Sequence, residues 1–238
     1  MSQQTVDTTA VETKQEETKL VEPKNLIFCI PGRQFSGNFL QCWTELSTYC
    51  TMRGHKWALS QRYSSNVYYV RNMCLGGNVL EGPDQKPFGG KVDYDYMVWI
   101  DSDVLFNSRQ FERLLSHDLP VVSGLYMMQD GKNFAAVENW NESDFSKEGS
   151  FKFLTPEDLK DRKDPFKVSY SGFGFTIIKK GVFEQLQYPW FRPHWKTIGN
   201  AQDFTSEDVG FCLSAQEKGI DIKIDPLVIL GHEKTVIL

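Results

Sequence analysis

Apolar and polar positions along the chain form blocks that predict strands and helices in turn. Short apolar runs bounded by Gly, Pro, Asn or Ser are typical of strands, and apolar residues spaced three and four apart are typical of helices. The pattern predicts strands at 25–30, 57–60, 96–100 and 119–126, with helices that begin at Ser36 or Asn38, at Ser64 or Ser65, and at Ser108. This β-α-β-α-β-α-β order predicts an α/β fold with a mostly parallel central sheet flanked by helices.

The second half of the chain has a less regular pattern. Residues 130–168 are irregular and charged, and residues 168–179 are strand-like. A helix is expected from Thr205 or Ser206 to Glu217, where Gly219 ends it, followed by strands at 220–224 and 227–232. Loops of the irregular kind often determine specificity.

Composition and charge narrow the function classes. The chain has 238 residues, of which 40% are hydrophobic, and a formal net charge of −5. No basic surface for nucleic acid is therefore expected. We expect neither a signal peptide nor a membrane span, since the sequence has no apolar run of that length and no basic segment followed by one. Five cysteines without a C-x-x-C pair favour reduced thiols, so we expect a cytoplasmic protein.

Two carboxylates follow the most apolar of these strands. Asp101 and Asp103 come directly after Tyr96–Ile100. Side chains two positions apart leave a strand on the same side, so the two carboxylates can point to one spot. They repel each other unless a cation lies between them, and hard oxygen ligands suit magnesium or manganese that carries a phosphate. An Asp-rich turn without a metal is the simpler alternative.

Two later segments carry further candidate groups. Glu207 and Asp208 stand at a predicted helix start, where acidic residues stabilise the helix dipole and where Thr205 with Asp208 fits a capping box. A general base is the functional alternative for this position. His232 follows an apolar strand; a lone His is usually structural, but a neutral imidazole here would favour manganese over magnesium.

Four segments occur in an order that carries a resemblance. They are Asp101-Ser102-Asp103, Gly172-Phe173-Gly174-Phe175, Ser206-Glu207-Asp208 and Gly231-His232-Glu233-Lys234. Together they resemble the metal-dependent, D-x-D-motif glycosyltransferases of the GT-A fold, over roughly residues 25–235. The resemblance implies one GT-A-like (Rossmann-like) domain at 25–238, with a nucleotide-binding half (25–126) and an acceptor and catalytic half (127–238) that carries a smaller second sheet. Residues 1–24 cannot form a core and are predicted to be a disordered tail.

The resemblance also implies roles for the charged residues. Asp103 would bind a divalent ion, Mn²⁺ or Mg²⁺, against the diphosphate of a nucleotide-sugar. Asp101 would lie near the ribose and the metal, and His232 would complete the metal shell. Asp208 is the first choice for the base that deprotonates the acceptor hydroxyl, and Glu207 is the second.

The remaining implied contacts line the donor pocket. The loop that begins at Pro31 resembles a nucleotide-binding loop, and Arg62 and Arg71 would lie near the nucleotide. The loop around Gly172 and Gly174 would approach the donor sugar and the acceptor, or would simply be a turn or bulge. The full set of implied donor contacts is Pro31, Gly32, Arg33, Arg62, Arg71, Asp101, Ser102, Gly172 and Gly174.

The expected function is transfer of a sugar from a UDP- or GDP-sugar to a hydroxyl on a glycan, protein or small-molecule acceptor, with inversion of configuration. Two alternatives remain open. In a phosphatase of the haloacid-dehalogenase type, the first Asp of a D-x-D pair is a nucleophile. A catalytically dead nucleotide-sugar-binding module would bind the donor without turning it over.

Overall fold

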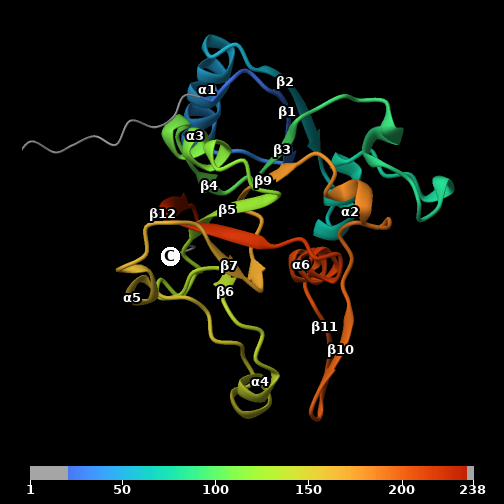
Figure 1. Cartoon of the computed structure of the whole chain (residues 1–238), viewed down its shortest axis with the longest axis vertical. Helices are drawn as coiled ribbons and strands as arrows, with labels where there is room; N and C mark the ends of the chain where they lie inside the picture. Colours follow the sequence, from blue (N-terminus) through green and yellow to red (C-terminus); the bar gives the residue numbers. More distant parts are fainter. Residues whose placement is uncertain (1–20, 235–238) are drawn as a thin grey trace, which may run out of the picture.

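The computed structural model describes residues 21–234, so most of the predicted tail (1–24) lies outside the described residues. An eight-stranded sheet runs through the molecule in the order β2-β1-β3-β9-β5-β12-β4, and β7 also pairs with β12 (Figure 1). The strands are β1 (Asn25–Pro31), β2 (Lys56–Arg62), β3 (Tyr96–Ile100), β4 (Val104–Leu105), β5 (Val121–Tyr126), β7 (Phe166–Val168), β9 (Phe175–Lys179) and β12 (Ile222–His232).

The long strands of this sheet run mostly in one direction. Strand β1 pairs in parallel with β2 and β3, and β5 pairs in parallel with β12. Strand β9 lies between β3 and β5 and is antiparallel to both, so β3 and β5 point the same way. The predicted α/β fold with a mostly parallel sheet is therefore confirmed.

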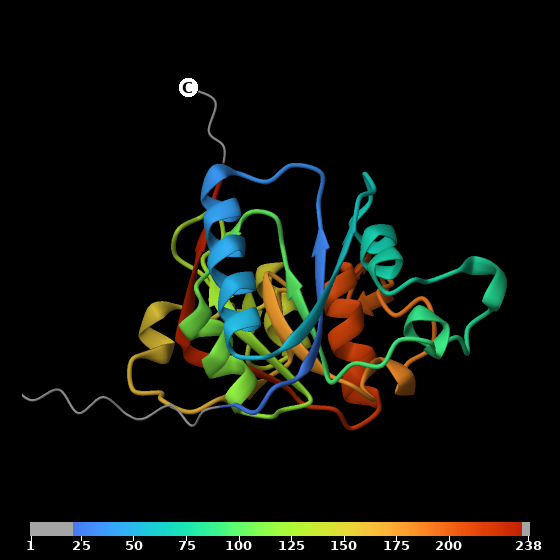
Figure 2. The ribbon, with the colours of Figure 1, turned by 90° about the horizontal axis from the view of Figure 1, so that it is seen from above.

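Helices cover both faces of the sheet. Helices α1 (Gly37–Met52) and α3 (Ser108–Ser116) lie on one face, and α2 (Val67–Cys74) and α6 (Glu207–Glu217) on the other (Figure 2). Alternate side chains of β3 point to opposite faces of the sheet. Val98 packs in the core under α1 and α3, and Trp99 packs with α2 and α6. Burial on both faces explains why the β3 sequence is apolar throughout.

The helix starts agree with the sequence to within two residues. Ser36 caps α1 as expected, because its Oγ accepts a hydrogen bond of 2.9 Å from the amide of Phe39. The cap of α2 is Asn66, not Ser64 or Ser65. The cap of α3 is Asn107, not Ser108, since Asn107 forms a capping box with Gln110.

The expected Thr205–Asp208 capping box is wrong. Helix α6 begins after Ser206, and the Asp208 carboxylate accepts a hydrogen bond from the neighbouring amide of Val209 at 2.8 Å instead. The Thr205 hydroxyl donates to the backbone carbonyl of Ser206 at 2.9 Å. Thr205 and Asp208 are therefore not hydrogen-bonded to each other as a capping box requires.

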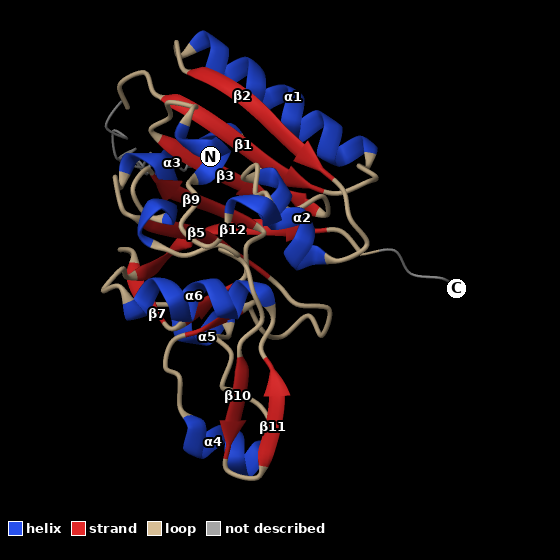
Figure 3. Cartoon of the chain, turned by 90° about the vertical axis from the view of Figure 1, so that its right-hand side faces the viewer, coloured by secondary structure: helices blue, strands red, loops and turns tan. Residues whose placement is uncertain are grey.

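The region predicted to be irregular contains short elements. They are β6 (Ala136–Val137), α4 (Glu142–Glu148), α5 (Pro156–Leu159) and β7; β6 pairs with β8 (Tyr170–Ser171) in a small second sheet. The hairpin of β10 (Trp195–Ile198) and β11 (Ala201–Phe204) was not predicted; it extends with α4 away from the sheet (Figure 3). Three 3-10 segments, η1 (Val79–Glu81), η2 (Pro87–Gly90) and η3 (Phe183–Gln185), complete the description.

Two expectations about the strands need correction. The strand-like run 168–179 is broken between β8 and β9, where Gly172-Phe173-Gly174 turns the chain. The strands expected at 220–224 and 227–232 form one long strand, β12, whose pairing with β5 is irregular between Ile224 and Ile229. Because β9 and β12 complete the central sheet, both halves of the chain contribute to it.

None of the helices in residues 21–234 is both long and apolar enough to cross a membrane. All five cysteines are free thiols.

Candidate functional site

The carboxyl end of β3 is joined to the end of β12 by backbone pairing. Val104 lies opposite His232 in the β4–β12 ladder, and the amide of Glu233 donates to the carbonyl of Asp103 at 2.7 Å. These contacts fix the two segments against each other. Asp103 and His232, 129 residues apart in the sequence, are thereby brought into contact.

The imidazole of His232 is oriented by the main chain. Its Nδ1 lies 2.6 Å from the carbonyl oxygen of Met127, and a carbonyl can only accept, so Nδ1 carries a hydrogen. In the neutral ring, Nε2 then presents its lone pair, and this atom lies 3.2 Å from Oδ2 of Asp103. A lone pair and a carboxylate oxygen attract each other only when a proton or a metal cation lies between them.

The segment after β12 supplies more contacts to this place. Nζ of Lys234 lies 2.7 Å from Oδ2 of Asp103, the same oxygen that His232 approaches. The carboxylate of Glu233 accepts hydrogen bonds from the Ser36 hydroxyl and from Nδ2 of Asn38, the latter at 2.7 Å. The segment that carries His232 is thus tied to the start of α1.

Across residues 21–234, no three His, Cys, Asp or Glu side chains converge in the manner of a complete metal centre. Asp103 and His232 provide two donors at one point, with chemistry that suits a divalent cation of the manganese type. The other ligands would have to come from water or a bound phosphate.

Asp101 has a different environment from Asp103. The guanidinium of Arg71 lies 3.0 Å from both Asp101 oxygens, and its Nε donates to Glu207 at 2.9 Å. Arg71 is only 3% exposed and packs against the rings of Trp99 and Phe173. Its guanidinium therefore joins the end of β3 to the start of α6, which differs from the nucleotide contact expected from the sequence.

Burial and charge pull the pKa values of these carboxyl groups in opposite directions. Desolvation raises the pKa of Asp101, and the charge of Arg71 opposes that shift. Desolvation likewise raises the pKa of Glu207; the neighbouring Asp208 adds to the rise and Arg71 opposes it. Because Glu207 is 7% exposed and paired with a buried cation, it is poorly placed to receive a proton from a substrate.

Asp208 is more accessible. It is half-buried at the start of α6, and its Oδ2 accepts a hydrogen bond of 3.1 Å from the hydroxyl of Tyr170. Desolvation and the charge of Asp208 raise the pKa of Tyr170, so the phenol keeps its proton and remains a donor. Of the two acidic residues at this helix start, Asp208 has the geometry of a general base.

The two glycines after β8 make room for a tyrosine. A Cβ at Gly172 would lie 2.1 Å from the hydroxyl oxygen of Tyr126, and one at Gly174 would lie 2.4 Å from its ring. The carbonyl of Gly174 also accepts a hydrogen bond from the amide of Asp101 at 3.0 Å. The ring of Tyr126 packs edge-to-face on His232, with centroids 4.8 Å apart. The glycines thus allow close packing beside Asp101 and His232.

The loop after β1 lies against the same strand end. Pro31 is buried at the end of β1, and a Cβ on Gly32 would lie 2.8 Å from Cβ of Ser102. Arg33 is exposed and lies 5.5 Å from the centre of the Tyr63 ring. Arg62 is also exposed and donates to the carbonyl of Gln61 at 2.8 Å. Gly32 and Ser102 therefore meet, and both arginines are at the surface.

Sequence reasoning missed several residues at this site. The orienting carbonyl of Met127, the packing ring of Tyr126, the phenol of Tyr170 and the ammonium of Lys234 were not singled out for a role. Lys234 could have been predicted to lie at the site, because it is a polar residue close to the candidate His in the Gly-His-Glu-Lys run. The tyrosines and the carbonyl carry no local signal, because only the fold brings them to the site.

Comparisons with known proteins give a likeness in fold. No family model matches the chain, and no curated protein matches it in sequence. Among solved structures, GalNAc-T7 crystallised with UDP, GalNAc and Mn²⁺ has a TM-score of 0.50 at 12% identity, over 90% of this chain and 44% of that one. This chain therefore spans less than half of that protein's length.

Two other solved structures align over most of the chain. A197 from STIV has a TM-score of 0.47 at 17% identity, over 90% of this chain and 96% of that one. The catalytic domain of Drosophila beta1,4galactosyltransferase 7 with xylobiose has a TM-score of 0.47 at 11% identity, over 89% of this chain and 71% of that one. The fold is GT-A-like, and the likeness to GalNAc-T7 extends to the fold alone.

Proposed function

We propose that this protein is a metal-dependent glycosyltransferase that moves a sugar from a UDP- or GDP-sugar to a hydroxyl acceptor. The convergence of Asp103 and His232 carries the proposal. A histidine whose Nδ1 is held by a carbonyl and whose Nε2 faces a carboxylate oxygen at 3.2 Å is arranged to share a cation. The GT-A-like fold of a structure with UDP and Mn²⁺ supports the same function.

We propose that a cation at Asp103 and His232 serves the diphosphate of the donor. Asp103 and His232 would hold Mn²⁺ or Mg²⁺, which when bound neutralises charge on a leaving nucleoside diphosphate. A cation at this point would take the place of the Lys234 ammonium on Oδ2 of Asp103. Lys234 would then be free to pair with a phosphate oxygen. Its chain position, two residues after His232, keeps it beside the metal.

Asp208 is the proposed general base. The Tyr170 hydroxyl donates to one of its oxygens and the Val209 amide to the other, so the carboxylate is held in one orientation. In this role it would receive the proton of the acceptor hydroxyl while the sugar is displaced with inversion. Arg71 would act as a positioning residue, because it fixes α6 and its Glu207 relative to Asp101.

The remaining donor contacts are proposed for the loop at Pro31, Gly32 and Arg33, for Arg62, and for Asp101 and Ser102. Gly32 packs on Ser102, so the loop and the D-x-D segment form one continuous wall. The exposed guanidinium groups of Arg33 and Arg62 are accessible to an anionic ligand. We propose 25–126 as the donor half and 127–238 as the acceptor half of one domain.

A phosphatase of the haloacid-dehalogenase type fits less well. It would need Asp101 as a free nucleophile, but both oxygens of Asp101 are engaged by Arg71 at 3.0 Å. A module that binds a nucleotide-sugar without turning it over remains the second candidate, favoured by the close approach of Lys234 to Asp103. Turnover distinguishes it from the enzyme.

The test is release of free nucleotide from UDP- and GDP-sugars with Mn²⁺, measured for the native chain and for Asp103→Asn. We expect turnover of at least one donor, its loss on chelation of the metal, and at least a hundredfold reduction in Asp103→Asn. Asp93→Asn is the matched control, because Asp93 is also paired with a lysine but lies outside the site. Nucleotide binding without turnover of any donor, under all conditions, would favour the binding module.

A further inference from the structure

A pocket opens beside the start of α6, the helix that carries the candidate base. Its cavity volume is about 210 Å³. Its walls come from four places: residues 137–153 around α4, Tyr170 of β8, the β10–β11 hairpin, and the start of α6. The α4 region and the β10–β11 hairpin extend away from the sheet, whereas α6 packs on one face of it (Figure 3).

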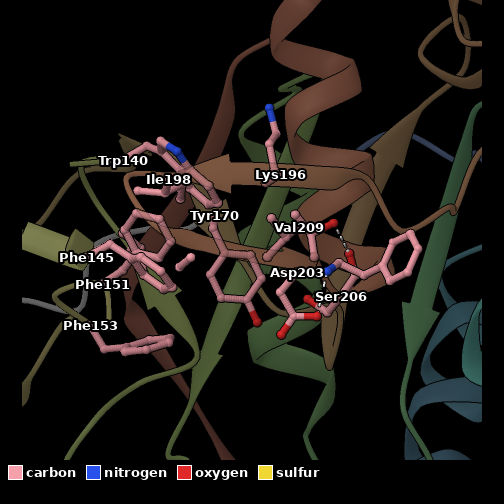
Figure 4. A pocket seen from close by; sticks show the side chains of 14 residues that line it. Trp140, Phe145, Phe151, Phe153, Tyr170, Lys196, Ile198, Asp203, Ser206 and Val209 are labelled. Atoms are coloured by element: carbon pink, nitrogen blue, oxygen red, sulfur yellow. Dashed lines mark hydrogen bonds between the residues drawn. The ribbon is translucent and has the colours of Figure 1, made fainter. Parts of the chain in front are cut away.

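Aromatic and aliphatic side chains form most of this pocket. The rings of Trp140 and Phe151 have centroids 4.0 Å apart, and those of Phe145 and Phe151 are 4.9 Å apart. Figure 4 shows the labelled rings of Trp140, Phe145, Phe151 and Phe153 on one side of Tyr170. A site that recognises a sugar through its hydroxyl groups would need many convergent polar side chains; of these four residues only Trp140 has a polar side-chain atom, and its indole N–H donates to Glu142 at 3.2 Å.

The polar groups lie at the other end. Asp203 and Ser206 are on the opposite side of Tyr170 in Figure 4. Tyr170 itself lines the pocket, and its hydroxyl donates to Asp208 at 3.1 Å. The pocket therefore has an apolar body and a polar end that is connected to the candidate base by one hydrogen bond.

We propose that this pocket binds the acceptor, and that the acceptor is an amphiphilic alcohol: an aryl or alkyl group fills the apolar end and a hydroxyl reaches Asp208. The inference rests on the proposed transferase function and adds the class of acceptor to it. The transfer forms a bond between the acceptor oxygen and the anomeric carbon, breaks the bond from that carbon to the nucleoside diphosphate, and passes the hydroxyl proton to Asp208. Burial of apolar surface supplies the affinity.

Binding is measured first without any donor, by tryptophan fluorescence, with three probes: phenyl β-glucoside, octyl β-glucoside and methyl β-glucoside. We expect the phenyl or the octyl compound to bind at least tenfold more tightly than the methyl compound, and the better of the two identifies an aryl or an alkyl body. The same order is expected for transfer rates with an active donor. Equal affinity for all three probes would overturn the inference.

Variants locate the binding site. Phe151→Ala removes a central ring, and Ala201→Trp fills the pocket from an exposed position on β11, where added bulk does not disturb the core. Both should weaken the binding of the preferred probe at least tenfold. Leu80→Ala, which removes a 90% exposed side chain that does not line the pocket, is the control.

The outcomes separate the inference from the function on which it rests. If donor hydrolysis is present but the two pocket variants bind the probes as the native chain does, the acceptor assignment is wrong and the transferase proposal stands. If the probes bind but no donor is turned over with or without them, the pocket is not an acceptor site and the transferase proposal fails with it.

Discussion

The guanidinium of Arg71 pairs with both oxygens of Asp101, at 3.0 Å each. Its remaining nitrogen, Nε, donates to Glu207 at 2.9 Å, so one buried cation neutralises two carboxylates from distant parts of the chain. A planar guanidinium can do this, whereas an ammonium cannot hold two carboxylates in a fixed geometry. The contact explains how the end of β3 and the start of α6 are held together.

Loss of this cation should destabilise the fold. Arg71→Met leaves Asp101 and Glu207 without a partner in a site of low water content, and breaking a buried ion pair of this kind costs about 3–5 kcal/mol. Urea unfolding measures the change. Adding Glu207→Gln to Arg71→Met should recover part of the loss, because one of the unpaired charges is removed. An Arg71→Met variant as stable as the native chain would contradict the assignment.

The two acidic residues at the start of α6 should behave differently. Asp208→Asn removes the proposed base while keeping the size of the side chain and one acceptor oxygen, so kcat should fall about 10²–10⁴-fold with little change in stability or donor binding. Glu207→Gln should instead lower stability, because Glu207 pairs with Arg71. Steady-state kinetics and thermal unfolding of both variants check this. A larger kcat loss in Glu207→Gln at native stability would reverse the roles.

Gly172→Ala should be destabilising because its Cβ would meet the Tyr126 hydroxyl at 2.1 Å. Overpacking of this kind costs about 1–3 kcal/mol. The double variant with Tyr126→Phe removes that oxygen and should recover most of the loss in a chemical-denaturation measurement. Gly131→Ala is a poor control because Gly131 has a positive φ, whereas Gly37→Ala is suitable, since nothing lies within 4 Å of its Cβ position.

Stability should depend on pH through Asp225, which is fully buried. Burial opposes its ionisation, but hydrogen bonds from His117 at 2.7 Å and from Arg113 at 2.6 Å outweigh that effect and lower its pKa. A lowered folded-state pKa gives stability that is present above the unfolded value, about 3.9, and is lost as the pH falls through the folded value.

Asp225→Asn tests the predicted direction of this pH dependence of stability. At pH 7 the variant should be less stable by about 3 kcal/mol, since the guanidinium of Arg113 loses its carboxylate partner. The difference should shrink below about pH 4 as the native carboxylate takes up its proton. Unfolding midpoints measured from pH 7 to pH 3 give the result. A difference that stays constant over this range would show that the ionisation of Asp225 makes no contribution.

The sequence predicted the parts of the fold that local patterns encode. The apolar run of β3 and the spacing of apolar residues in α1 each indicate that one element is buried, so both elements were predicted. The hairpin β10–β11 was missed because residues such as Trp195 and Phe204 are largely exposed and give no clear alternation. The merging of two expected strands into β12 depends on pairing with β5, which no local window contains.

In the candidate site, too, some contacts were predicted from the sequence and others were not. Asp103 and His232 were expected to meet, and the structure brings them together. Arg71 was expected near the nucleotide, but its burial between two carboxylates follows from long-range packing that spacing cannot reveal. The pocket at Trp140 and Phe151 lies in the region where the sequence predicted no regular structure.

The most direct test of the central claim is calorimetric titration of Mn²⁺ in the presence of UDP, for the native chain and for His232→Ala. A shared ion between Asp103 and His232 predicts one Mn²⁺ per chain, with affinity reduced at least tenfold in the variant. His55→Ala is the control, because His55 bonds to Lys24 away from the site. Equal Mn²⁺ affinity in the native and His232→Ala chains would contradict the account.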